Sequence, residues 1–131
     1  MKRSPGLRTL SSEHHTGLVL ARRAAQAAAD EEVADTWREV AQRFEAELEP
    51  HFRQEEEILL PALVLVGETA IVQRTLAEHA QLRALVYDGP RDAQTLGSFA
   101  ELLQAHIRFE ERELFSIAQT RLPEFSLETP S

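Results

Sequence analysis

The chain contains no cysteine. This absence excludes disulfides, cysteine-based zinc sites, iron–sulfur clusters and a thiol nucleophile. Any metal ion must therefore be bound through nitrogen and oxygen atoms. The sequence also lacks a Ser-His-Asp arrangement, a glycine-rich phosphate loop and a nucleotide-binding fingerprint, which argues against the common hydrolases and nucleotide-dependent enzymes.

Positive charge and long apolar runs are both scarce. The chain has 14 Lys+Arg against 22 Asp+Glu, a formal net charge of −8. Because an acidic chain repels phosphate groups and anionic lipids, we expect neither nucleic acid nor a membrane as partner. The longest apolar run, residues 58–66, contains Pro61 and is too short to span a bilayer. The first 15 residues lack the apolar stretch of a signal peptide, so we predict a cytoplasmic protein.

The length and composition are those of one globular domain. The 131 residues include 43% hydrophobic and 27% charged side chains. We predict a single domain over residues 1–131, with its core at about 10–122 and a loosely held tail at 123–131. Four stretches have helical periodicity, and no strand pattern competes with them. The sequence therefore predicts an all-α, antiparallel up-down-up-down four-helix bundle.

Local signals place the ends of these four helices. We expect the first helix to begin at Ser11 or Ser12 and to end at Asp30-Glu31-Glu32, and the second to span about residues 35–60. The third helix should begin near residue 68 or 69 and end at the turn Asp88-Gly89-Pro90, and the fourth should span about residues 92–119. Pro50 should kink the second helix beside His51, and Pro61 should end or bend it.

One phrase occurs twice. HFRQEEEILL (residues 51–60) and HIRFEERELF (residues 106–115) both read His, apolar, Arg, any residue, Glu, Glu. In each copy a histidine precedes a glutamate by four residues, as His51 precedes Glu55 and His106 precedes Glu110. This spacing places both side chains on one face of a helix. The repetition also implies a pseudo-twofold relation between the two helix pairs.

The other histidines fit the same scheme. His79 lies on the apolar face of the third helix, and the first helix offers His14 and His15. Helical phase favours His14, whereas the word His-x-Gly-Leu favours His15. We prefer His15 as the ligand and expect the other to support it or to be exposed.

Burying four histidines and two carboxylates without a metal would be costly, at about 1–3 kcal/mol for each unpaired polar group. Imidazole and carboxylate ligands suit iron or manganese, allow zinc and disfavour calcium. Two acidic ligands favour a dinuclear centre, bridged by Glu55 and Glu110.

These motifs resemble the hemerythrin-like proteins of the HHE cation-binding type. The family order is His, His-x-x-x-Glu, His, His-x-x-x-Glu, and it is met by His14 or His15, His51–Glu55, His79 and His106–Glu110. The resemblance covers about residues 10–122. It implies a non-haem di-iron centre and a role in oxygen binding or sensing, iron storage, or the handling of peroxide or nitric oxide.

Two positions depart from the oxygen-carrying members of that family. Arg83 stands where the carriers place a second histidine of the third helix, so we expect one iron to lack a ligand. An open coordination position suits redox or peroxide chemistry better than reversible oxygen carriage. The last helix carries Glu110 and Glu111 in place of the carriers' His-x-x-x-x-Asp pattern. We interpret Tyr87 as a core residue with a solvated hydroxyl group.

Several glutamates flank the candidate ligands. We expect most of them to form a solvated face and one to accept a hydrogen bond from a ligand imidazole. They are Glu13, Glu56, Glu57, Glu78, Glu111 and Glu113.

Three other functions remain open at this stage. A di-iron peroxidase or catalase would turn over peroxide, whereas a metal-stabilised interaction module would bind metal without redox chemistry. The small residues at 24–29 would allow the helices of two chains to approach closely in a homodimer of such a module. We expect the protein to be a monomer or a homodimer. A metal-free bundle is the remaining alternative, and it predicts that chelation leaves the melting temperature unchanged.

Overall fold

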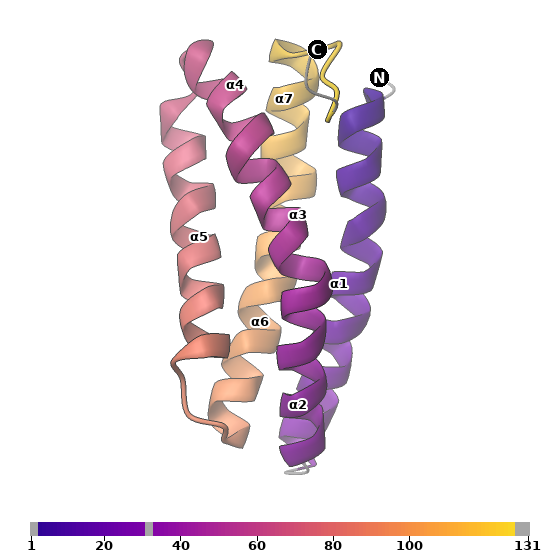
Figure 1. The fold of residues 1–131 in the computed structure, drawn as a ribbon, viewed down its shortest axis with the longest axis vertical. Coiled ribbons are helices and arrows are strands. Elements are labelled where there is room, and N and C mark those ends of the chain that lie inside the picture. Colours follow the sequence, from indigo (N-terminus) through magenta and orange to yellow (C-terminus); the bar gives the residue numbers. More distant parts are fainter. Residues whose placement is uncertain (1–2, 31–32, 128–131) are drawn as a thin grey trace.

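The computed structural model describes residues 3–30 and 33–127. Four helical segments run alternately up and down, which confirms the predicted all-α four-helix bundle (Figure 1). The elements are α1 (Pro5–Ala29), α2 (Ala34–Arg43), η1 (Phe44–Leu48), α3 (Glu49–Gln54), η2 (Glu55–Leu59), α4 (Leu60–Leu65), α5 (Thr69–Tyr87), α6 (Ala93–Phe109), η3 (Glu110–Leu114) and α7 (Phe115–Arg121). No β-strand occurs in the described ranges. No helix there is both long and apolar enough to cross a membrane.

The first helix begins earlier than predicted. It starts at Pro5, whose fixed φ suits the first helical turn, and neither Ser11 nor Ser12 is its cap. Buried positions then follow at intervals of three and four residues, the period of an amphipathic helix. They are Leu7, Leu10, His14, Gly17, Ala21 and Ala24. The predicted break after this helix includes residues 31 and 32, which lie outside the described residues. The fourth helix begins as predicted, with Asp92 accepting a hydrogen bond from the backbone N–H of Thr95 at 2.7 Å.

The second helical segment is continuous from α2 to α4 and contains two wide turns. In η1 the N–H of Glu49 donates to the carbonyl of Phe44, and in η2 the N–H of Leu60 donates to that of Glu55. The residue whose N–H closes each wide turn directly precedes a proline, which has no N–H to continue the ladder. Pro61 therefore interrupts the regular pattern but does not end the helix, which continues to Leu65.

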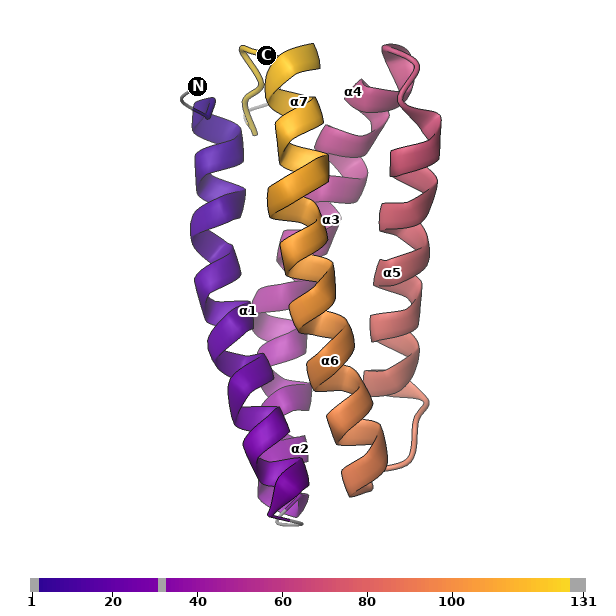
Figure 2. The ribbon, with the colours of Figure 1, turned by 180° about the vertical axis from the view of Figure 1, so that it is seen from behind.

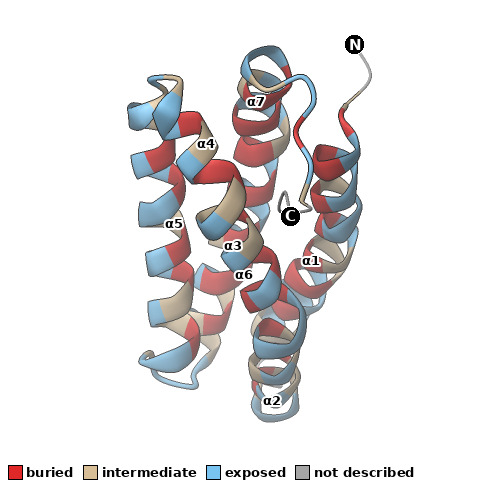
Figure 3. Cartoon of the chain, turned by 45° about the horizontal axis from the view of Figure 1, so that its top comes forward, coloured by how far each residue is buried: buried red, intermediate tan, exposed pale blue. Residues whose placement is uncertain are grey.

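The apolar core is divided into two clusters by a layer of polar side chains. Trp37 and Phe99 belong to the cluster near the connection between α1 and α2. Leu10 and Phe115 belong to the cluster at the opposite end, where both termini lie. Figure 3 shows the buried residues of the helices facing the interior of the bundle. The two clusters seal the polar layer at both ends.

Helix α6 lies between α1 and α5, as Figure 2 shows from behind. Gly17 permits the close approach of α1, because a Cβ atom at this residue would lie 2.8 Å from Cδ1 of Ile107. The contact between Gly17 and Ile107 brings the first and fourth helical segments together beside the polar layer.

The beginning of the predicted tail is packed against the bundle. Phe125 is only 8% exposed, and its carbonyl accepts a hydrogen bond of 3.3 Å from the N–H of Gly6. A Cβ atom at Gly6 would lie 2.7 Å from the Phe125 ring, so only glycine leaves room for this contact. The expectation of a loose tail is therefore wrong at Phe125, and residues 128–131 lie outside the described residues.

Candidate metal centre

Six buried side chains from all four helical segments meet in the polar layer. They are His14 from α1, His51 from α3, Glu55 at the start of η2, His79 from α5, His106 from α6 and Glu110 at the start of η3. They form two groups, and in each group four ligand atoms lie within 4.8 Å of one another. His14 and His51 make up one group with Glu55 and Glu110, whereas His79 and His106 make up the other with the same two glutamates.

Each glutamate faces both pairs of histidines. Oε1 of Glu110 lies 2.7 Å from Nε2 of His14 and 3.8 Å from that of His51. Its Oε2 atom lies 3.0 Å from Nε2 of His106 and 3.5 Å from that of His79. Glu55 lies in the same way, with Oε2 3.3 Å from His51 and Oε1 3.0 Å from His79. Two carboxylates so placed have the geometry of bridges between two cations.

Wide helical turns begin at both glutamates of the buried centre, Glu55 and Glu110. The N–H of Leu60 donates to the carbonyl of Glu55, and the N–H of Phe115 donates to that of Glu110, each across five residues. Single π-helical turns of this kind change the direction of neighbouring side chains and are frequent at functional sites. The repeated phrase of the sequence thus folds into the same local structure twice.

A second layer of carboxylates lies behind the histidines. Nδ1 of His51 lies 3.0 Å from Glu13, and Nδ1 of His79 lies 2.7 Å from Glu56. Nδ1 of His106 lies 2.7 Å from Glu78, and Nδ1 of His14 lies 3.5 Å from Glu111. A carboxylate behind Nδ1 holds the proton on that nitrogen and turns the lone pair of Nε2 toward the centre, the arrangement of many metal-bound histidines.

These contacts follow one direction around the bundle. The first segment supports the second through Glu13, the second supports the third through Glu56, the third supports the fourth through Glu78, and the fourth supports the first through Glu111. Each neighbouring pair of segments is thereby connected once.

Apart from Nε2 of His14 and Oε1 of Glu110, which contact each other at 2.7 Å, the atoms that face the centre lack hydrogen-bond partners. They are Nε2 of His51, His79 and His106, both carboxylate oxygens of Glu55, and Oε2 of Glu110. A buried polar atom without a partner costs about 1–3 kcal/mol, and native proteins rarely leave several together. Nitrogen and oxygen atoms converging on one small space fit a cation or a pair of cations.

Protons and cations compete for these atoms. Burial disfavours charge on His51, but the negative charge of Glu55 and hydrogen bonds to carboxylates outweigh it and raise the pKa of His51 to about 12. At His79, hydrogen bonding to Glu110 outweighs the effect of burial and raises the pKa to about 10. At His106, the negative charge of Glu110 outweighs the effect of burial and raises the pKa to about 9. Metal binding must therefore release protons.

The structure separates the two adjacent histidines of the first helix. His14 is buried and contacts Glu110, whereas His15 is exposed to solvent. The preference for His15 is therefore wrong for this fold, and the helical phase that favoured His14 is the better guide. Tyr87 is 50% exposed and its ring packs on Phe44, so the interpretation of Tyr87 as a core residue is wrong.

Each group contains two histidines and Arg83 belongs to neither, so the expectation that one iron lacks a ligand stays a prediction. Instead, Arg83 donates to the carboxylate of Glu56 at 2.8 and 3.1 Å. The sequence analysis expected one of the flanking glutamates to support a histidine, and in the structure four of them lie behind histidines. Their signal was positional: Glu13 and Glu78 each precede a histidine, and Glu56 and Glu111 each follow a glutamate of the buried centre. Glu57 and Glu113 are exposed, as expected.

Comparison with known proteins agrees with the geometry. Residues 6–118 match the family described as Hemerythrin HHE cation binding domain. No curated protein and no solved structure matches the chain. The family match covers most of the sequence and includes all six residues of the buried centre. The chain therefore belongs to the hemerythrin HHE cation-binding domain family.

Proposed function

We propose that the protein binds two metal ions side by side in the middle of the bundle. His14 and His51 would bind one ion, His79 and His106 would bind the other, and Glu55 and Glu110 would bridge them. The sharing of both glutamates by two buried groups carries this proposal, because a mononuclear site would need only one group. The unpaired inward-facing atoms give the same indication.

Iron is the metal that we propose. A set of four imidazoles and two carboxylates without thiolate suits iron, and manganese or zinc would fit the same donor atoms. A pair of irons would supply redox chemistry and coordination positions for oxygen, peroxide or nitric oxide. We propose a role in sensing, storing or handling one of these species or iron itself, in the cytoplasm.

The chain's own residues would position and shield such a centre. Outer glutamates accept hydrogen bonds from Nδ1 of His51, His79 and His106, which fixes the orientation of these three rings. The ring of Phe52 stacks on His79 with centroids 3.9 Å apart, and Phe115 stacks on His14 with centroids 5.2 Å apart. Both phenylalanines are buried, so water is kept from these faces of the imidazoles.

Metal content and the visible spectrum of protein from iron-supplemented cells test this proposal. We expect about two irons per chain, which is one for each group, and near-ultraviolet absorption that changes on adding peroxide or dithionite. Protein that contains zinc or no metal, and that gains no iron after anaerobic reconstitution, would refute the di-iron proposal. Peroxide turnover by the iron-loaded protein, lost in Glu55→Ala or Glu110→Ala, would identify the catalase or peroxidase alternative.

A further inference from the structure

The pseudo-twofold relation of the site is broken beside Glu56. Arg83 follows His79 by four residues, and the corresponding residue after His14 is Leu18. Glu49 precedes His51 by two residues, and the corresponding residue before His106 is Gln104. One side of the site therefore carries an arginine and a glutamate where the other side carries leucine and glutamine.

On the charged side, Arg83 connects two glutamates of the second segment. Its guanidinium group donates to both oxygens of Glu56, at 2.8 and 3.1 Å, and to both oxygens of Glu49, one of them at 3.3 Å. Glu49 is 7% exposed and relies on this contact to be buried. The guanidinium group also lies 5.6 Å from the ring of Phe52, which stacks on His79. His79 is thus held by Glu56 behind its ring and by Phe52 on its face.

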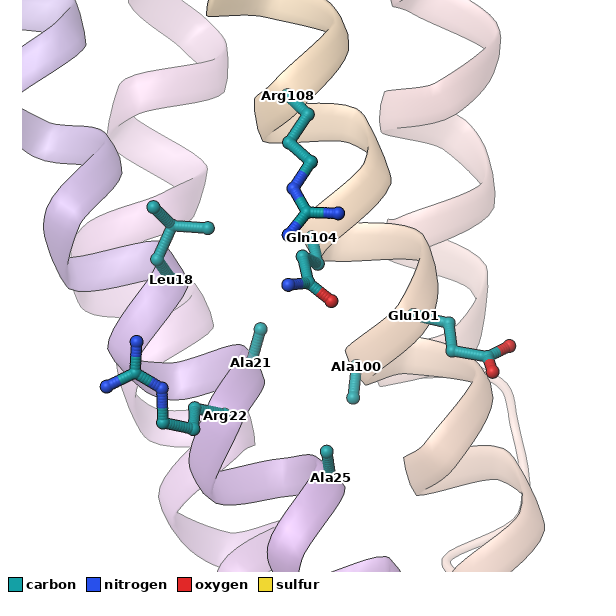
Figure 4. A pocket seen from close by; sticks show the side chains of 8 residues that line it. All are labelled: Leu18, Ala21, Arg22, Ala25, Ala100, Glu101, Gln104 and Arg108. Atoms are coloured by element: carbon teal, nitrogen blue, oxygen red, sulfur yellow. The ribbon is translucent and has the colours of Figure 1, made fainter.

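On the corresponding side, leucine and glutamine take the places of the arginine and the glutamate. Leu18 and Gln104 line a surface groove of about 340 Å³ between α1 and α6 (Figure 4). Glu111, which corresponds to Glu56, is held by the hydroxyl group of Ser11 and by Arg3. Its distance to Nδ1 of His14 is 3.5 Å, against 2.7 Å between Glu56 and His79. His14 also has a ring on its face, Phe115 at 5.2 Å with Arg3 above it, but its Nδ1 atom has no hydrogen-bond partner. The contact behind its ring is therefore weaker than the contact of Glu56 with His79.

We propose that Arg83 is a positioning residue that makes the two metal positions unequal, so that the position of His79 and His106 binds its metal first and more tightly. This inference rests on the proposed two-metal site. A ligand that is already fixed loses less freedom on binding, and outer partners of metal-bound histidines typically contribute 10–100-fold to metal affinity. Outer glutamates lie behind the histidines of both groups, but they lie closer, at 2.7 Å each, behind His79 and His106, and Arg83 holds the one behind His79.

Anaerobic titration of the metal-free protein with Co²⁺, followed by visible absorption, tests the inference. We expect two resolved binding steps in the wild-type protein. The double variant Arg83→Leu/Glu49→Gln gives this side the residues of its counterpart and avoids leaving Glu49 buried without a partner. In this variant we expect the tight step to weaken by about 10–100-fold, so that the two steps merge.

Two further variants assign the steps. Arg53→Leu is the control, because Arg53 is exposed and approaches Glu49 at 3.5 Å without contacting Glu56, and we expect both steps to persist. His14→Ala should retain the tight step and His79→Ala the weak one. Two equal steps in the wild-type protein, or separate steps that persist in the folded double variant, would overturn the inference alone. A wild-type protein that binds no cobalt would refute the proposed metal site itself and this inference with it.

Discussion

Replacing one of two adjacent histidines tests the assignment of the site most directly. His14 is 5% exposed, and its Nε2 atom lies 2.7 Å from Glu110, whereas its neighbour His15 is exposed. The two residues are both histidines and are adjacent in the chain, and they differ in the direction of the side chain. We expect His14→Ala to lose one of two metal ions and His15→Ala to retain both.

The expected size of the effect follows from linkage between binding and folding. A metal that binds only the folded state at 100 times its Kd stabilises that state by about 2.7 kcal/mol, so two positions contribute roughly 5 kcal/mol. For a chain of this length, 1 kcal/mol shifts Tm by roughly 4 °C. Metal should therefore raise Tm by roughly 20 °C in the wild-type protein and in His15→Ala, and by roughly 10 °C or less in His14→Ala.

Calorimetry of each protein with and without metal, together with metal analysis, measures this effect. Comparing the gain on metal addition, and not Tm itself, removes the packing loss caused by the shorter side chain. An equal gain in all three proteins would refute the assignment of His14. A loss of metal in His15→Ala alone would show that the first helix turns differently from the structure.

Three further predictions concern the bridges, the protons and the tail. Because both groups share Glu55 and Glu110, Glu110→Ala should lose both metal ions in metal analysis, and retention of one ion at full affinity would contradict the bridging role. In the metal-free protein the pKa values of His51, His79 and His106 lie at about 12, 10 and 9, above the ordinary value near 6.5. The contribution of these three protonated histidines to stability is complete below about pH 6.5 and is lost as pH rises through the folded-state pKa values. The free energy of unfolding in urea should therefore be lower at about pH 9 than at about pH 6.5, and the same free energy at both pH values would contradict this prediction. Finally, Phe125→Ala should destabilise the bundle by about 3 kcal/mol in the same unfolding assay, whereas a loosely held residue would change stability by less than about 0.5 kcal/mol.

Much of the fold could be predicted because each helix carries its own periodic pattern. The start of α5, the cap at Asp92 and the pairing of His with Glu depend on neighbours a few residues apart. The start of α1 was misplaced because Ser11 and Ser12 are good caps, whereas Pro5 begins the helix in the structure. What holds this early turn is the distant contact of Gly6 with Phe125, which no local pattern contains.

The candidate site was predictable in its donor atoms and not in its supporting contacts. His51, Glu55, His106 and Glu110 follow from a repeated spacing. The partner of each outer glutamate follows only from the packing of neighbouring segments, and the sequence neighbour is misleading: Glu13 precedes His14 but supports His51. The word His-x-Gly-Leu favoured His15 for a related reason, because a short word does not include the angle at which α1 meets the core.

The arrangement of contacts implies that the metal centre and the bundle form together. Neither helix pair contains a complete group, because each group takes two histidines from one pair of segments and a glutamate from each half of the repeat. The outer glutamates connect each segment to the next around the bundle, so removing any segment leaves one remaining histidine without its outer glutamate. Six buried polar residues also prevent the two apolar clusters from merging into one core. Cations that neutralise this layer would therefore stabilise the whole bundle, and the binding free energy would appear as folding free energy.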